Sequence, residues 1–317
     1  MKSRPHLPIA NMSAVPRVPA WARSRGSVKR DVDGAYIAGA ALNSLDNLVR
    51  GEPAWGGAWR QRLALKAAAA ATRLVGRKEE EGALRDAQFF RAAGDEPGPA
   101  GNLLMAWRRM ASRSTGLDEA AVRAVAERLD VKWDDALAEM VVNAEDLLAS
   151  SRPAPVLAAE LAAELYRVRP DAELLALWLA DMLLAQKFRW PIPVPLLMGQ
   201  VNSSAFKTAD DRRRVRPGGE GWSGAVFLAY AQAAVEACDL GSELAGRAAH
   251  LVGVVPKLRA KGADEVVKLL LDDDAVPSSR SGTRLTDRSA RRLFERLGDL
   301  GAVRELSGRA TFRLYGL

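Results

Sequence analysis

The sequence predicts an all-α protein, a multi-helical bundle that ends in a C-terminal winged helix-turn-helix with a small β-hairpin wing. Three observations predict this fold. Apolar residues recur at three- and four-residue steps from Asp31 onwards, which is the spacing of one helical face. Strand-like alternation is confined to the end of the chain, at 303–306 and 311–315. The 317 residues are 48% hydrophobic, which is enough for a sizeable core. The sequence contains no run of eighteen apolar residues, and so it predicts no membrane span.

Residues 1–30 are predicted to form a flexible basic arm. They hold seven Lys and Arg, no acid and four prolines, and they lack the continuous apolar stretch of a secretory signal. Trp21 is expected to dock the end of this arm on the body. The helical body is assigned to residues 31–255, and the winged-helix module to residues 256–317.

The body helices are predicted from periodic apolar positions that lie between turn signals. The small residues Ala67–Ala71 would let a neighbouring helix approach closely. The helix Leu174–Gln186, capped by Asp171, is apolar on nearly every face and is therefore expected at the centre of the bundle. The predicted body helices cover residues 31–49, 55–75, 79–91, 100–112, 118–129, 134–150, 153–169, 174–186, 196–201 and 222–255.

The last segment of the chain predicts a helix, a turn, a basic helix and a hairpin, which is the order of a winged helix-turn-helix. The first helix covers Ala263–Asp272. The second begins at Thr286, whose hydroxyl can accept a hydrogen bond from a free backbone N–H, and Gly301 ends it as a C-cap. The segments 303–306 and 311–315 flank a turn and would form the wing.

The second helix of such a module enters the major groove, where its polar face meets bases and phosphates. Arginine suits this role because its guanidinium fork binds phosphate or guanine through two hydrogen bonds. Three acids, Asp287, Glu295 and Asp299, interrupt the basic face and could pair with the arginines locally. The predicted nucleic-acid-binding residues are Arg284, Thr286, Arg288, Ser289, Arg291, Arg292, Arg296, Arg309 and Arg313.

The net charge of +7 is distributed unevenly along the chain. Residues 1–30 carry +7 and residues 275–317 carry +5, so the remaining body carries −5. Basic ends on an acidic body are typical of a protein that binds a polyanion. The alternative is an arginine-rich composition that decorates the surface without a function.

The sequence offers no catalytic set, no metal site and no cofactor motif. Two histidines, His6 and His250, and the single cysteine Cys238 are too few for a structural zinc site or a nucleophile–base arrangement. His250 is expected to be a partly buried structural residue, and Cys238 a small buried hydrophobe. The acids Asp272–Asp274 lack the Gly and distal Glu of a calcium loop and are expected at a helix end. A non-enzymatic cytoplasmic protein is therefore predicted.

Eight stretches spread over nearly the whole chain carry a family resemblance. They are Gly57–Leu65, Ala83–Ala87, Gly94–Gly101, Ala106–Arg109, Pro256–Gly262, Asp273–Pro277, Gly301–Gly308 and Arg313–Leu317. Together they resemble an uncharacterised alphaproteobacterial family catalogued only as a domain of unknown function (family number 1403). The resemblance implies no activity.

A second pattern is the order of an apolar helix (174–186), a proline-rich turn (191–197), a loop, a long helix and a winged helix. This order is similar to that of Fic-type proteins, which are helical AMP-transferases. The Fic signature His-Pro-Phe-x-x-Gly-Asn-Gly-Arg is absent, and no histidine lies between His6 and His250. The resemblance therefore implies a scaffold without catalytic residues.

The predicted function is DNA binding in a regulatory role, through the C-terminal winged helix and with the basic arm assisting. The expected partners are double-stranded DNA and a homodimer or protein partner, with no membrane and no cofactor. The helical body would serve as an effector, dimerisation or partner platform. A second hypothesis is a protein-interaction or structural protein whose winged helix only packs. A third is an enzyme on a divergent Fic-like scaffold.

Overall fold

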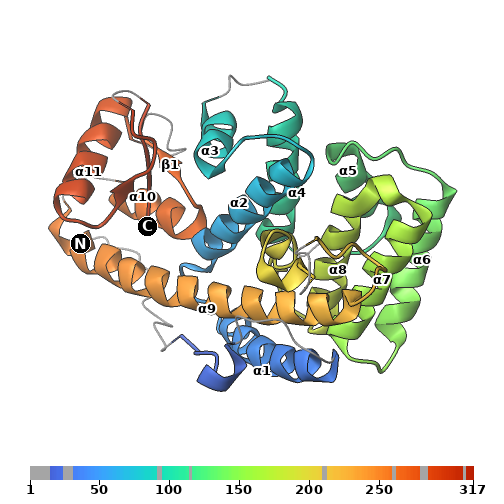
Figure 1. Ribbon diagram of the computed structural model, residues 1–317. Helices are drawn as coiled ribbons and strands as arrows, with labels where there is room; N and C mark the ends of the chain where they lie inside the picture. Colours follow the sequence, from blue (N-terminus) through green and yellow to red (C-terminus); the bar gives the residue numbers. More distant parts are fainter. Residues whose placement is uncertain are drawn as a thin grey trace.

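The computed structural model describes residues 15–23, 31–90, 95–113, 116–208, 213–258, 262–278, 285–309 and 312–317. Over these ranges the chain is mostly helical, with eleven α-helices and one small sheet. The predicted all-α class is confirmed. Helix α9 (Trp222–Val254) runs the length of the molecule and joins the C-terminal elements at one end to the bundle at the other (Figure 1). Helix α1 (Asp31–Arg50) lies along one side of α9.

The other elements follow the predicted order, and most boundaries shift by one to three residues. The helices are α2 (Gly56–Leu74), α3 (Glu81–Phe89), α4 (Gly98–Ser112), α5 (Glu119–Arg128), α6 (Asp135–Ala149), α7 (Ala154–Val168), α8 (Glu173–Lys187), α10 (Ala263–Asp272) and α11 (Asp287–Asp299). The strands are β1 (Val276–Pro277), β2 (Arg304–Glu305) and β3 (Leu314–Gly316). The predicted helix 196–201 is only a short 3-10 turn, η3 (Met198–Gln200).

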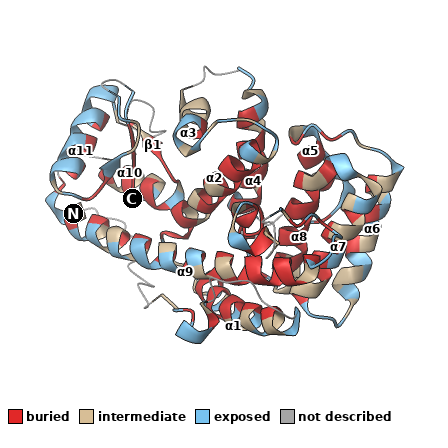
Figure 2. Cartoon of the chain, in the orientation of Figure 1, coloured by how far each residue is buried: buried red, intermediate tan, exposed pale blue. Residues whose placement is uncertain are grey.

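Helix α8 is the centre of the bundle, as its composition predicted. Twelve of its fifteen residues are buried, so that it packs on every side (Figure 2). Asp171 does not cap it, which corrects the prediction. The Asp171 carboxylate instead binds the Arg169 guanidinium at 2.6 Å, and a 3-10 turn, η2 (Pro170–Ala172), leads into the helix. Arg169 donates to both oxygens of this carboxylate, at 2.9 and 2.6 Å, and a bidentate pair of this kind is among the strongest that a carboxylate makes.

Small residues and tryptophans set the helix packing. Residues Ala67–Ala71 of α2 are all buried, and α2 packs closely on α4, as predicted. Where α9 crosses α1, a Cβ added at Gly241 would lie only 3.0 Å from Leu48 Cδ2. The Trp59 indole is fully buried and donates its N–H to the Ala237 carbonyl at 2.9 Å, which satisfies a polar group that burial would otherwise leave unpaired.

Part of the predicted arm lies against the body. Val18 and Ala22 are buried, and the Trp21 ring stacks on Tyr36 of α1 with ring centroids 5.3 Å apart. The predicted docking of Trp21 is therefore confirmed. Residues 1–14 and 24–30 of the predicted arm fall outside the described ranges.

Within the described ranges, no helix combines the length and the hydropathy that a membrane span requires.

Candidate nucleic-acid interface

The C-terminal elements form a three-stranded antiparallel sheet with the order β1-β3-β2. Strands β2 and β3 pair with Glu305 opposite Tyr315, so the two predicted wing segments do associate, although the strands are shorter than predicted. Strand β1 was not predicted, because two residues are too few to show alternation. It pairs with the other edge of β3, with Val276 opposite Tyr315. The Phe294 ring of α11 stacks on the Tyr315 ring at 4.9 Å, which holds the helix on the sheet.

Both ends of α11 are defined by the residues that the sequence indicated. The Thr286 hydroxyl accepts from the Ser289 backbone N–H at 3.3 Å, which satisfies one free donor of the first turn. Gly301 follows the helix with a φ of +66°, the left-handed conformation of a C-cap glycine. The His250 ring lies 2.8 Å from the Leu300 carbonyl and donates to it through Nε2. His250 is thus structural, but it is exposed rather than partly buried as expected.

The two faces of α11 differ sharply in burial (Figure 2). The side facing the module is apolar, and the opposite side carries arginines. Within the described ranges, none of these guanidinium groups makes an ion pair or a hydrogen bond, and Asp287, Glu295 and Asp299 do not pair with them. The buried residues are Ala290, Leu293, Phe294 and Leu297, and the exposed ones include Arg288, Ser289, Arg291, Arg292 and Arg296.

The predicted wing arginines are placed differently. Arg309 forms an ion pair with Asp86 of α3, and its guanidinium carbon lies 5.0 Å from the centroid of the Phe90 ring. Phe312 meets the same ring edge-on at 6.2 Å. The Arg313 side chain donates to the Arg309 carbonyl at 3.2 Å. The wing therefore rests on α3, and Arg309 faces protein. The remaining predicted residue, Arg284, lies outside the described ranges.

An ion-paired junction fixes the module to the body. Asp274 is only 2% exposed and lies between Arg62 of α2 and Arg85 of α3, at 2.6 and 2.5 Å. Burial would raise the pKa of Asp274, but the hydrogen bonds and charges of Arg85 and Arg62 outweigh it and hold the pKa below its ordinary value. Arg108 of α4 binds the neighbouring Asp273 through two hydrogen bonds of 3.0 and 2.7 Å.

The backbones meet closely at this junction. A Cβ added at Gly57 would lie 2.6 Å from the Asp272 Cα, and one at Gly316 would lie 2.4 Å from the Asp274 carbonyl oxygen. Only glycine fits such approaches. The sequence indicated that Asp272–Asp274 ends a helix, which α10 confirms, but not that two of these acids hold the module in place. Nothing local to them signals partners about 165 to 212 residues away.

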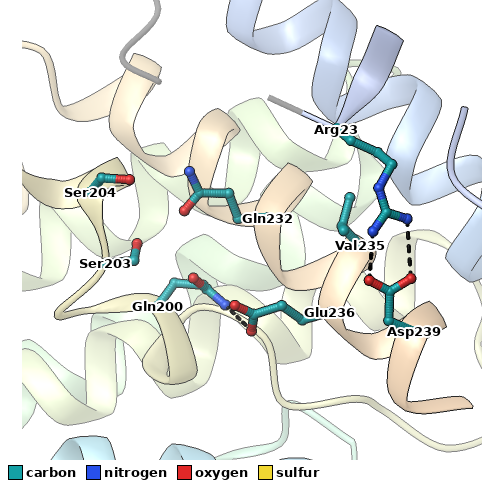
Figure 3. A pocket seen from close by; sticks show the side chains of 8 residues that line it. All are labelled: Arg23, Gln200, Ser203, Ser204, Gln232, Val235, Glu236 and Asp239. Atoms are coloured by element: carbon teal, nitrogen blue, oxygen red, sulfur yellow. Dashed lines mark hydrogen bonds and ion pairs between the residues drawn. The ribbon is translucent and has the colours of Figure 1, made fainter. Parts of the chain in front are cut away.

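A separate hollow of about 420 Å³ lies between α9, Arg23 and the turns η3 and η4 (Ser204–Phe206) (Figure 3). Its polar groups already have partners: Arg23 forms an ion pair with Asp239 at 2.6 Å, and the neutral Gln200 amide donates to Glu236 at 2.7 Å. Lys66 also binds Glu236. With its charges already matched, the hollow offers less to a polyanion than the exposed face of α11.

Comparison with protein-family models matches residues 7–317 to a family described as "Protein of unknown function (DUF1403)". The match covers nearly the whole sequence, including every element described above. No curated protein matches the sequence significantly.

Proposed function

The chain belongs to this family, as its resemblance predicted, and from the surface of α11 we propose that it binds double-stranded DNA in a regulatory role. One observation carries the proposal: four arginines, Arg288, Arg291, Arg292 and Arg296, stand on the exposed face of α11 without an acidic partner among the described residues. A cationic helix face with no internal counter-charge suits a phosphate backbone, because binding there breaks no existing ion pair.

The element order supports a winged helix-turn-helix. Helix α10 would be the first helix, α11 the groove-reading helix, and β2 and β3 the wing. The junction of Asp273 and Asp274 with α2, α3 and α4 would hold α11 at a constant orientation to the body. The body would then act as an effector, dimerisation or partner platform. The proposal implies a cytoplasmic location, where a lone thiol such as the buried Cys238 stays reduced.

The test is the salt dependence of duplex binding by the full-length protein, measured by fluorescence anisotropy. We expect Arg288→Gln, Arg291→Gln and Arg292→Gln combined to reduce the slope of log affinity against log salt by roughly 0.9 for each lost phosphate contact. The combined variant should therefore bind at least tenfold more weakly at low salt.

A matched control carries the same change of net charge. Arg123, Arg152 and Arg167 are surface arginines of α5, of the loop before α7 and of α7, each paired with an acid. Their triple replacement by Gln should leave the slope unchanged. Undetectable binding by the wild type, binding insensitive to salt, or equal losses in both triple variants would overturn the proposal.

The contact of the wing with α3 favours a second candidate, a protein-interaction or structural role in which the winged helix only packs. Arg309 is engaged by Asp86 and Phe90, and so it is withheld from DNA in this arrangement. If the module binds DNA, Asp86→Asn should free Arg309 for one more phosphate. We then expect a several-fold tighter complex at low salt and a slope steeper by up to about 0.9.

If the module only packs, Asp86→Asn should produce no DNA binding and change the unfolding free energy by about 1 kcal/mol or less, as for other exposed ion pairs. Glu80→Gln is the control. Glu80 is exposed and directly precedes the same helix, and its replacement by Gln removes the same negative charge. Tighter binding in both variants would show only the effect of net charge.

A further inference from the structure

A second group of arginines gathers where α4 and α5 lie side by side. Arg109 lies in the last turn of α4, and Arg113 follows four positions later as the extended C-cap residue of that helix. Arg128 of α5 reaches back to this part of α4, with its Nη1 3.6 Å from the sulfur of Met105, which lies one turn before Arg109. Arg113 and Arg128 both lie close enough to Arg109 for their positive charges to act on it.

These cations are poorly compensated. Among the described residues none of the three forms an ion pair, and the Arg109 Nε is buried without a hydrogen-bond acceptor. Burial lowers the pKa of Arg109, and the positive charges of Arg113 and Arg128 lower it further, against a smaller opposing effect of Asp118. The Asp118 carboxylate is engaged elsewhere, because it caps α5 by accepting from the Ala121 N–H at 2.9 Å.

Helix electrostatics account for only part of this arrangement. A cation near the last turn of α4 is favoured by the negative end of the helix dipole. One arginine is enough to satisfy this preference of the helix dipole. The dipole therefore does not explain why Arg128 of α5 also lies here. Arg123, also on α5, shows the usual outcome for a surface arginine, since it pairs with Glu119 at 2.7 Å. A buried N–H that lacks a protein acceptor is a donor that an oxygen of water or of a ligand can satisfy.

We propose that Arg109, Arg113 and Arg128 bind a phosphate group, either inorganic phosphate or the terminal group of a small phosphomonoester. A phosphate dianion presents several oxygens and so can accept from three guanidinium groups at once, whereas a carboxylate has two oxygens and one charge. An oxygen on the Nε edge of Arg109 supplies the acceptor that this N–H lacks. Helices α5 and α11 lie at opposite sides of the molecule (Figure 1), so this site is separate from the proposed DNA interface.

The experiment is calorimetric titration of the full-length protein with inorganic phosphate, with sodium chloride of equal ionic strength as the reference. We expect saturable binding that weakens roughly tenfold or more in Arg109→Gln and in Arg113→Gln, as is typical when a hydrogen bond to a charged group is lost. Arg113 is exposed at the end of α4, so its variant tests the site even if Arg109→Gln does not fold. Arg123→Gln should bind as the wild type does.

Three results would overturn the proposal. They are no phosphate binding by the wild type, an equal response to chloride, and unchanged binding in both the Arg109 and Arg113 variants. Duplex binding separates the source of the phosphate. Arg109→Gln should keep wild-type affinity for DNA, and a loss there would show that the group recognised is the phosphodiester of nucleic acid and not a small molecule.

Discussion

Asp274→Ala is expected to lower the free energy of unfolding by about 3–5 kcal/mol, because it removes the anion from a buried cluster and leaves its cations behind. The Arg62 and Arg85 side chains are only 17% and 13% exposed, and both bind this one carboxylate. Water cannot readily replace a partner at such depth. Urea unfolding of the wild type and the variant at pH 7 would measure the loss.

Asp272→Ala is the matched control, since Asp272 belongs to the same acidic run but its side chain is exposed and forms no ion pair among the described residues. It should cost about 1 kcal/mol or less. Equal losses in the two variants would show that the cluster adds nothing beyond a surface charge. The pH dependence gives a second measurement. Because the folded-state pKa of Asp274 lies below its ordinary 3.8, the stabilisation is present above about pH 4 and is lost as the pH falls further.

Asp181→Asn should make the protein more stable above pH 7 and leave it nearly unchanged below about pH 4. Asp181 is fully buried in α8 and accepts from the backbone N–H groups of Leu196 and Leu197 at 2.8 and 3.1 Å. Burial, opposed by those hydrogen bonds, raises its pKa to about 7. The asparagine oxygen can still accept from the same N–H groups, but it never carries a charge.

The sign of the pH effect follows from that raised pKa. The folded protein holds the Asp181 proton more tightly than the unfolded chain does, so the favourable contribution is complete below about pH 4 and is lost as the pH rises to 7. A rise of the Asp181 pKa from 3.8 to about 7 corresponds to about 4 kcal/mol. The difference in unfolding free energy between the wild type and Asp181→Asn, measured at pH 5, 6, 7 and 8, should grow in this window. Asp146→Asn, a change at an exposed position, should show the same pH dependence of the unfolding free energy as the wild type. If Asp181→Asn also showed the same pH dependence as the wild type, the raised pKa of Asp181 would be contradicted.

The helices were predictable because their signals are local. The apolar stripe of α11, its Thr286 cap and its Gly301 terminus all lie within sixteen consecutive residues. The burial of α8 follows from a composition with almost no polar side. The exposure of the α11 arginines follows in turn, because a helix that packs one apolar stripe turns its other face outward.

The candidate site was predicted only in part. The helical periodicity predicted that Arg288, Arg291 and Arg292 lie on the exposed face of their helix, and in the structure all three are exposed. It gave no indication that Arg309 would meet Asp86, 223 residues earlier in the chain. The sequence also did not predict the group of Arg109, Arg113 and Arg128. These residues form a group only because the packing of α5 on α4 brings Arg128 near the other two.

The sequence by itself determined the helical class, the order of the elements and the basic face of α11, since each depends on residues within one or two helical turns. Only the tertiary structure decided which charges are neutralised. Asp274 is a buried partner of two arginines, Arg309 contacts α3, and the arginines of α11 have no ion-pair partner among the residues that the structure describes. The physical reason is that an ion pair requires two groups within about 4 Å, and that proximity is set by how distant helices pack.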